Sequence, residues 1–268
     1  MLHLGKRNIL GVQISAIDYE AAVARIIASA ANCERLTVSA LAVHGVMTGV
    51  LDPAQQFRLN HLDLVVPDGQ PVRWALKLLH GLELPDRVYG PTLTQEVCKA
   101  AAARGLPVFF FGSRPPVLEA LSRNLQARIP GLRVAGIEPS RFRCLSQSEQ
   151  LELAARIRRS GASIVFVGLG CPRQEVSVYE LGHMLSLPLI AVGAAFDFHA
   201  GTLPQAPPRM QRAGLEWLYR LASEPRRLWR RYVFLNPLYL GLVLMQALKI
   251  RRFHGSSDAV PPEFVRFG

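Results

Sequence analysis

Asp68 is the residue whose type and position best fit acid–base chemistry in this sequence of 268 residues. It follows an apolar run at 62–66 and lies in the turn Pro67-Asp68-Gly69, so we expect it at the carboxyl end of a strand. In open α/β sheets, ligands bind beyond these strand ends, and a carboxylate there acts as a general base if it reaches a substrate hydroxyl. An aspartate in such a turn also serves as a turn former or helix cap, which by residue type alone is the commoner use.

Two glycine-containing loops follow other apolar runs and are candidates for binding phosphate groups. Backbone N–H groups in such loops can approach a phosphate closely when a helix follows. Neither loop matches the dinucleotide-binding or P-loop spacing, and similar turns also occur without any ligand. The candidate residues are Gly112 and Ser113 in the first loop, and Gly168, Gly170, Arg173 and Gln174 in the second.

The sequence predicts no metal site. Asp197 and His199 are two ligand types close together, but two such residues without partners are more often core or capping residues. No Asp-x-Asp pair occurs in the chain. An enzyme of sugar nucleotides built from this sequence would therefore neutralise a diphosphate with arginines and backbone dipoles rather than with a carboxylate-held ion.

The positive charge is concentrated near the carboxyl terminus. Residues 209–252 hold ten lysines and arginines and two glutamates, a net +8 of the chain's +11. Such a block indicates an anionic partner, although a solvated helix face is the alternative. Arg220, Arg227 and Arg230 would share one helix face if Pro225 bends the chain only mildly, and such a row clamps a diphosphate well. No nucleic-acid-binding module accompanies it, so we expect no nucleic-acid partner.

An apolar stretch at 233–248 is too short for a membrane span. It has 16 residues, among them Asn236, Pro237 and Gln246, whereas a span needs about 20 mostly apolar residues. Two arrangements remain open: a helix lying among lipid headgroups with arginines toward phosphates, or a helix packed on the protein's own core. The amino terminus has no signal-peptide pattern, and the four cysteines show no disulfide or metal spacing, which favours a cytoplasmic protein.

Short apolar runs alternating with amphipathic stretches predict an α/β fold, with a Rossmann-like sheet of mostly parallel strands and helices on both faces. We expect an α/β domain at 1–205, a basic helical appendage at 206–252 with breaks near Pro225 and Pro237, and a flexible tail at 253–268. The predicted strands are 35–39, 62–66, 107–111, 133–136, 163–167 and 188–192.

Six segments occur together in an order that resembles the WecG/TagA/CpsF family of bacterial glycosyltransferases, over about residues 8–235. They are Val66-Pro-Asp-Gly69, Arg87-Val-Tyr-Gly90, Val108-Phe-Phe-Phe-Gly112, Val167-Gly-Leu-Gly-Cys-Pro-Arg-Gln-Glu175, Val192-Gly-Ala-Ala-Phe-Asp197 and Gly214-Leu-Glu-Trp-Leu-Tyr-Arg220 with Glu224-Pro-Arg226. The resemblance implies transfer of a sugar, typically N-acetylmannosamine or its uronic acid, from a UDP-sugar to a polyprenyl-diphosphate-linked saccharide. It also implies inversion at the anomeric carbon without a metal or other cofactor.

By the same resemblance, Asp68 matches a catalytic base, Thr37 a site threonine and Gln174 a pocket glutamine. Arg220, Arg227 and Arg230 match arginines that close over the diphosphate. Ser39 stands where the family usually has asparagine, and Thr92 where it usually has aspartate, which bears on sugar specificity more than on reaction type. Arg87 completes the substrate-binding candidates.

We therefore expect a UDP-sugar-dependent transferase of cell-envelope or exopolysaccharide synthesis, bound peripherally to an anionic membrane surface on the inner face of the cell membrane. The competing class is a nucleotide-binding or membrane-docking protein whose site has degenerated, an interpretation that Ser39 and Thr92 keep open. A second alternative is a basic nucleic-acid binder, which predicts salt-sensitive binding to any polyanion. The sugar, the acceptor, the polysaccharide and the formation of a homo-oligomer are not specified by the sequence.

Overall fold

A six-stranded sheet forms the centre of the part of the chain that the computed structural model describes, residues 1–255 and 267–268 without the side chains of Pro208, Arg227, Arg230 and Arg231. All its strand pairs are parallel. The order across the sheet is β4 (Leu64–Pro67), β3 (Leu36–Leu41), β8 (Pro188–Ala191), β7 (Ile164–Gly168), β5 (Val108–Gly112) and β6 (Val134–Glu138). The α/β class and all six predicted strands are confirmed, and most of the tail predicted at 253–268 lies outside the described residues.

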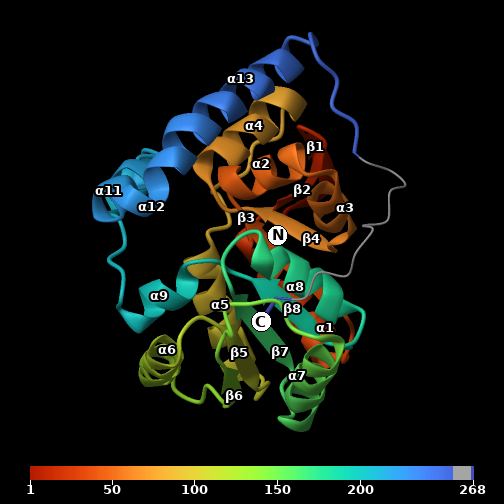
Figure 1. The fold of residues 1–268 in the computed structure, drawn as a ribbon, viewed down its shortest axis with the longest axis vertical. Helices are drawn as coiled ribbons and strands as arrows, with labels where there is room; N and C mark the ends of the chain where they lie inside the picture. Colours follow the sequence, from red (N-terminus) through yellow and green to blue (C-terminus); the bar gives the residue numbers. More distant parts are fainter. Residues whose placement is uncertain (256–266) are drawn as a thin grey trace.

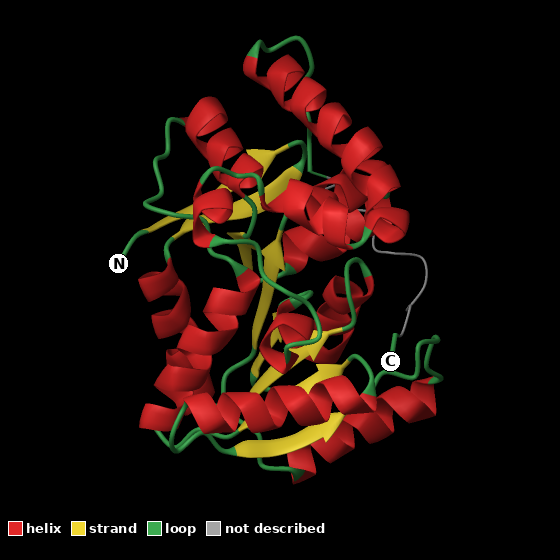
Figure 2. Ribbon diagram, turned by 90° about the vertical axis from the view of Figure 1, so that its left-hand side faces the viewer, coloured by secondary structure: helices red, strands yellow, loops and turns green. Residues whose placement is uncertain are grey.

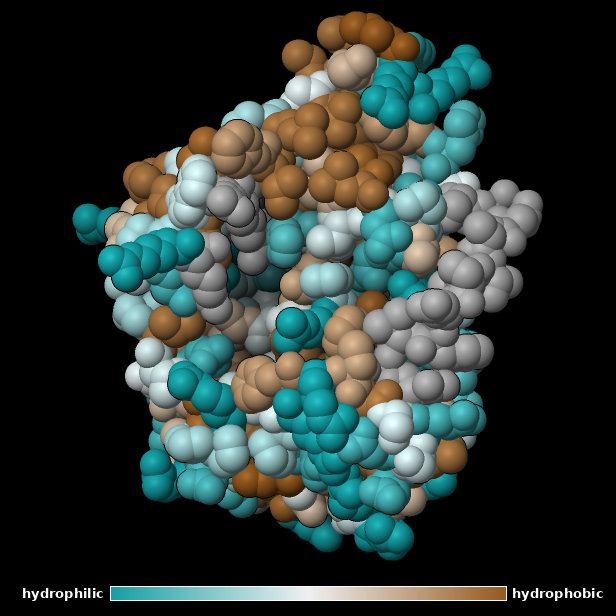
Figure 3. Space-filling model, in the orientation of Figure 1, coloured by the Kyte–Doolittle hydropathy of each residue, from teal (hydrophilic) through white to brown (hydrophobic). Residues whose placement is uncertain are grey.

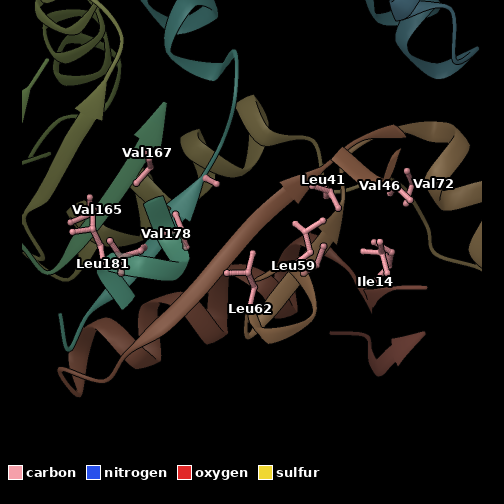
Figure 4. Packing of buried hydrophobic residues seen from close by; sticks show 14 of the residues in the cluster. Ile14, Leu41, Val46, Leu59, Leu62, Val72, Val165, Val167, Val178 and Leu181 are labelled. Atoms are coloured by element: carbon pink, nitrogen blue, oxygen red, sulfur yellow. The ribbon is translucent and has the colours of Figure 1, made fainter. Parts of the chain in front are cut away.

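Both faces of the sheet are buried along every strand except the edge strand β6, because alternate side chains of these strands enter two different cores. Val165 and Val167 of β7 pack on one side, whereas Ile164 and Phe166 pack on the other. Figure 2 shows the strands between helices, and Figure 4 shows part of the first core around β3 and β7. The near-continuous apolar sequence of these strands follows from this double burial.

Separate sets of helices cover the two faces. The first face is covered by α2 (Val43–Leu51), α3 (Pro53–His61), α4 (Gln70–His80), α7 (Gln147–Arg159) and α8 (Arg173–Gly182). The second is covered by α1 (Tyr19–Ala31), α5 (Gly90–Ala103), α6 (Pro115–Arg128) and α9 (Ala195–Ala200). In α6 the four-residue spacing of apolar positions has the predicted effect, since Val117, Leu121 and Leu125 are all buried.

An antiparallel hairpin at the amino terminus was not predicted. Strands β1 (His3–Ile9) and β2 (Val12–Ile17) form a separate two-stranded sheet. The turn between them holds Leu10 and Gly11, both with positive φ. Ile9, Val12 and Ile14 join the core on the first face of the main sheet, so the hairpin extends that core sideways.

The basic segment forms a helical appendage: α10 (Pro208–Arg212), α11 (Glu216–Ser223), α12 (Pro225–Arg230) and α13 (Asn236–Ala247). Pro225 begins α12, so the predicted break there is correct. The break predicted near Pro237 is wrong, because a π-helical turn, Arg231–Leu235, joins α12 directly to α13. A wider turn just before a proline accommodates its ring and missing N–H.

Helix α13 packs beside α4 at one end of the molecule (Figure 1). It buries Tyr239 and Val243 in the core of the first face and leaves Leu240 and Leu244 exposed. Within the described residues, no helix is long and apolar enough to cross a bilayer.

A glycine contact sets the spacing of β5 and β7 where both strands end. Gly112 has φ +116°, and a Cβ there would lie 2.7 Å from the backbone carbonyl of Gly168. We expect Gly112→Ala to lower the free energy of unfolding, measured by urea denaturation, by clearly more than the roughly 1–2 kcal/mol of left-handed strain alone. Gly161→Ala is the matched control, since Gly161 has φ +70° but no atom within 4 Å of such a Cβ. Equal losses in the two variants would mean that close packing of the strands is unimportant.

Candidate active site

Two cavities at the carboxyl end of the sheet share Asp68. The larger has a volume of about 830 Å³, within the usual range for small-molecule sites. The smaller has a volume of about 100 Å³ and lies against α4, α11 and the start of α13. The residues common to both linings are Ala42, His44, Asp68, Tyr89 and Arg220.

Asp68 directly follows β4 and is held from two sides. Its N–H donates to the carbonyl of Leu41 at the end of β3, and its Oδ1 accepts from the N–H of Gly90, the first residue of α5, at 3.0 Å. It does not cap α4, whose N-cap residue Gly69 has no side-chain cap. The alternative interpretation of Asp68 as the cap of the following helix is therefore wrong.

Burial raises the pKa of Asp68 to about 6, mainly because water is excluded from the carboxylate. The positive charges of Arg87 and Arg220 act in the opposite direction, and the negative charge of Glu216 adds to the rise. A carboxylate with a pKa near 6 is largely ionised at neutral pH yet is more basic than an exposed aspartate.

The segment from Arg87 to Gly90 connects Asp68 to the appendage. Arg87 and Tyr89 are buried, and the guanidinium of Arg87 lies 4.2 Å from the centre of the Tyr89 ring. Both side chains donate to Glu216, the first residue of α11, Arg87 Nη2 at 2.5 Å and Tyr89 Oη at 2.8 Å. Arg87 thus lines the smaller cavity as part of an ion pair. Sequence reasoning missed Tyr89 and Glu216, although both stand inside the family-like segments.

Arg220 is the predicted appendage arginine that the structure brings to Asp68. It lines both cavities, its guanidinium lies 5.7 Å from the centre of the Phe198 ring, and it pairs loosely with Glu224 at 3.8 Å. Arg227 and Arg230 belong to α12, but their side chains lie outside the described residues. Their predicted contacts stay predictions.

The two predicted loops line the larger cavity with Ser113, Gly168, Gly170 and Gln174. Gln174 is buried, accepts from the N–H of Gly193 at 2.9 Å and donates to Glu175 at 2.8 Å, so it joins the loops after β7 and β8. Gly112 lies behind the lining, against Gly168. Arg173 is exposed and outside the lining, 5.7 Å from the centre of the Phe267 ring.

The first loop offers side chains rather than helix N–H groups to a ligand. Pro115 and Pro116 are the first two residues of α6 and have no N–H to donate. Arg114, the N-cap residue, lines the larger cavity and is exposed. Any anion bound here would meet this guanidinium and the Ser113 hydroxyl. Arg114 was not among the predicted site residues.

Thr37 and Ser39 are not brought to either cavity. Thr37 is the second residue of β3, about 13 Å from the strand's carboxyl end at the usual rise per residue, and its hydroxyl donates to Asp63 Oδ2 at 2.7 Å. Ser39 is buried below the site and donates to Glu175 at 3.1 Å. The lining residues of this strand and its loop are Ala40, Leu41 and Ala42. The strand runs two residues past its predicted end, so the residues that line the cavity lie beyond the predicted strand.

No described group resembles a metal centre. Among the described residues, no three His, Cys, Asp or Glu side chains are placed to share an ion. Asp197 lines the larger cavity and accepts from Thr202, whereas the ring of His199 is buried and bonds the carbonyl of Pro91 at 2.8 Å. These two residues therefore do not act together as ligands of one ion.

Comparison of the sequence with known proteins shows which family the chain belongs to. Residues 7–253 match the glycosyl transferase WecG/TagA/CpsF family. The chain belongs to this family. A curated relative from Bacillus spizizenii, an N-acetylglucosaminyldiphosphoundecaprenol N-acetyl-beta-D-mannosaminyltransferase, is 31% identical over 194 residues, which cover 72% of each chain. The resemblance expected from the motifs is confirmed.

This family member also holds a fully buried carboxylate at the larger cavity, Glu175, which was not among the predicted site residues. Its Oε1 accepts from Ser39 and Gln174, and the side chain is fully buried at the floor of the larger cavity. Burial raises the pKa of Glu175, although these hydrogen bonds partly oppose the rise. The folded protein therefore favours the protonated form relative to the unfolded chain.

We expect Glu175→Gln to keep or raise the thermal unfolding midpoint, with a gain over the unchanged protein that grows between pH 5 and pH 8. The pKa of Glu175 is raised on folding, so its contribution to stability falls as pH rises above the ordinary glutamate value of about 4.3. Glutamine retains the accepting oxygen and cannot ionise. Glu175→Ala is the control, because it leaves Ser39 and Gln174 without their acceptor at every pH. A Glu175→Gln protein that is less stable than the original at pH 8 would contradict this prediction.

Proposed function

We propose that this protein is an inverting, metal-independent glycosyltransferase that moves an N-acetylmannosamine-type sugar from a UDP-sugar to a polyprenyl-diphosphate-linked saccharide. The observation that carries the proposal is the position of Asp68, which lies between a cavity large enough for a sugar nucleotide and a smaller one beside an apolar surface. The sugar and the acceptor are those in the name of the Bacillus spizizenii relative.

The UDP-sugar donor fits the larger cavity by volume and by chemistry. Its lining offers Arg114 and Arg220 as cations and the backbone of Gly168 and Gly170 for close approach to a diphosphate. The proposal needs no metal, since these guanidinium groups would offset the charge that grows on the departing UDP.

In the proposed reaction, an acceptor hydroxyl loses its proton to Asp68 while its oxygen attacks the anomeric carbon of the donor. The new carbon–oxygen bond forms as the bond to the UDP oxygen breaks, and the electron pair of that bond leaves with UDP. Attack from the face opposite to UDP inverts the anomeric centre. Asp68 fits the base because it faces both cavities and has a pKa near 6.

The acceptor's lipid is proposed to stay in a membrane that contacts the appendage. Apolar side chains gather over α13 and neighbouring elements at one end of the molecule (Figure 3), and Trp217 and Tyr232 continue them to the smaller cavity. Exposed arginines such as Arg226 lie in the same segment. In this proposal α13 combines the two arrangements considered from the sequence. One side of the helix packs on the protein's core, and the other would enter the lipid headgroup region.

The deciding experiment incubates the purified protein with a panel of UDP-sugars and short-chain lipid-diphosphate saccharides, with and without EDTA. We expect transfer of one sugar with inverted configuration, unaffected by EDTA. Donor binding without transfer from any panel member would support the alternative of a degenerate nucleotide-binding or membrane-docking protein.

Asp68→Asn tests the proposed base. Asparagine retains an oxygen that can accept from Gly90, so the fold and UDP affinity should be kept. Turnover should fall by roughly 10²–10⁴-fold, the usual effect of losing a general base. Calorimetric UDP binding checks the intact site, and turnover close to that of the unchanged protein would rule out this role.

Leu244→Glu tests the proposed membrane surface. Leu244 is 54% exposed on α13, and loss of its insertion should weaken sedimentation with anionic vesicles about tenfold or more. Leu151→Glu is the matched control, because Leu151 is 51% exposed on α7, away from the appendage. If both variants sediment like the original protein, the surface on α13 does not contact lipid.

A further inference from the structure

Glu216 is the appendage residue that pairs with a buried cation beside Asp68, and Gln211 of α10 also accepts from that cation, Arg87, at 3.3 Å. Each carboxylate oxygen of Glu216 accepts one buried donor, Oε2 from Arg87 and Oε1 from Tyr89. The same short segment contacts Asp68 and its strand, since Gly90 donates to Asp68 and the N–H of Val88 donates to the carbonyl of Pro67. Hydrogen bonds at both ends of the segment 87–90 therefore connect α11 to the proposed base.

The two arginines near Asp68 differ in how tightly they are held. Arg87 is nearly fully buried and paired, so its position is set by Glu216. Arg220 is only partly buried and pairs loosely with Glu224 at 3.8 Å. The titratable and charged groups that face Asp68 or line its cavities come from every element around it. They are Tyr19 from α1, His44 from α2, Arg87 and Tyr89 from the connecting segment, Arg114 from the loop after β5, Cys171 from the loop after β7, Glu175 from α8, Asp197 from α9, Glu216 and Arg220 from α11, and Tyr232 from the π-helical turn.

After Glu216, Asp68 is the carboxylate that interacts most strongly with the charge of Arg87. Both carboxylates act on the Arg87 guanidinium and raise its pKa, Glu216 more strongly than Asp68. Without Glu216, Arg87 would keep the neutral amide oxygen of Gln211, at 3.3 Å, but no anionic partner. A buried cation without a counter-charge is costly, so loss of Glu216 would draw Arg87 toward Asp68. A base in direct contact with a guanidinium is weaker and is also less free to meet a substrate hydroxyl.

We propose that Glu216 is a positioning residue of the reaction, which docks α11 beside Asp68 and holds the Arg87 guanidinium away from that carboxylate. This inference rests on the proposed role of Asp68 as the base. It assigns the appendage a second task besides binding: the base keeps its strength only while α11 is docked. Glu216 itself touches no reacting atom.

The test compares the titration of Asp68 in variants of the whole protein, followed by the ¹³C signal of its carboxyl group and assigned with Asp68→Asn. The unchanged protein should titrate near pH 6. Glu216→Gln should move the midpoint to lower pH by about one unit or more, because Arg87 loses its stronger partner. Arg87→Gln should move it to higher pH, since Glu216 then faces Asp68 without a cation. The double variant should fall between the two single variants.

The acid limb of the pH–rate profile should move in the same directions, and the plateau rate of Glu216→Gln should fall roughly tenfold as the base weakens. Glu138→Gln is the matched control, because Glu138 bonds Arg156 at 2.9 Å on β6, outside both cavity linings. That variant should leave the Asp68 midpoint unchanged.

A Glu216→Gln protein that loses activity with an unmoved Asp68 midpoint would show a purely structural role and overturn the proposal. If Glu216→Gln does not fold, the Asp68 midpoint of Arg87→Gln is compared with that of the double variant. Equal midpoints in these two proteins would also overturn the proposal. The carboxyl titration requires no turnover. Absence of sugar transfer by the unchanged protein would therefore refute the proposed function without deciding the effect of Glu216 on Asp68.

Discussion

The parallel direction of all six main-sheet strands is the constraint on which the site depends. In such a sheet every strand ends at the same edge, so residues far apart in sequence, such as Asp68 and Gly193, come to one place. Helices bury both faces of the sheet except at its edge strand β6, so polar side chains inside a buried strand need hydrogen-bond partners just before a neighbouring strand or on a covering helix. Thr37 with Asp63 and Ser39 with Glu175 are the result. Only the strand ends and their loops are open to substrates.

The appendage completes this edge by burying charge rather than by adding apolar contacts alone. Arg87, Tyr89 and Glu216 are each less than one-tenth exposed, and Asp68 stands beside them. A buried ion pair contributes little net stability, because removing two charges from water offsets their attraction. Here the pair determines geometry. Both Glu216 oxygens must be aligned with their donors, Arg87 and Tyr89, for the hydrogen bonds to form, and this alignment fixes the position of α11 relative to α5.

Much of the fold and part of the site could be predicted from sequence for identifiable reasons. Continuous apolar runs located all six strands of the main sheet, and the turn after one of them located Asp68. The hairpin His3–Ile9 with Val12–Ile17 was missed because its first strand is mostly polar and mostly exposed or half-buried, so it has no continuous apolar run. Thr37 was misplaced because a shift of a few residues along a strand separates the floor of the sheet from its edge. Glu216 could not be predicted, since its partner Arg87 is distant in sequence and spacing alone does not pair them.

The two prolines that begin α6 have a consequence for how this site can diverge. A helix amino terminus with free N–H groups binds anions through the backbone, which every substitution leaves in place. Here Pro115 and Pro116 remove those donors, and the loop meets the cavity through Ser113 and Arg114. On this side of the cavity, the affinity for a ligand would therefore depend on the side chains of Ser113 and Arg114, while the backbone stays the same. Point substitutions at these positions can change ligand preference during evolution while the sheet, its packing and Asp68 stay the same.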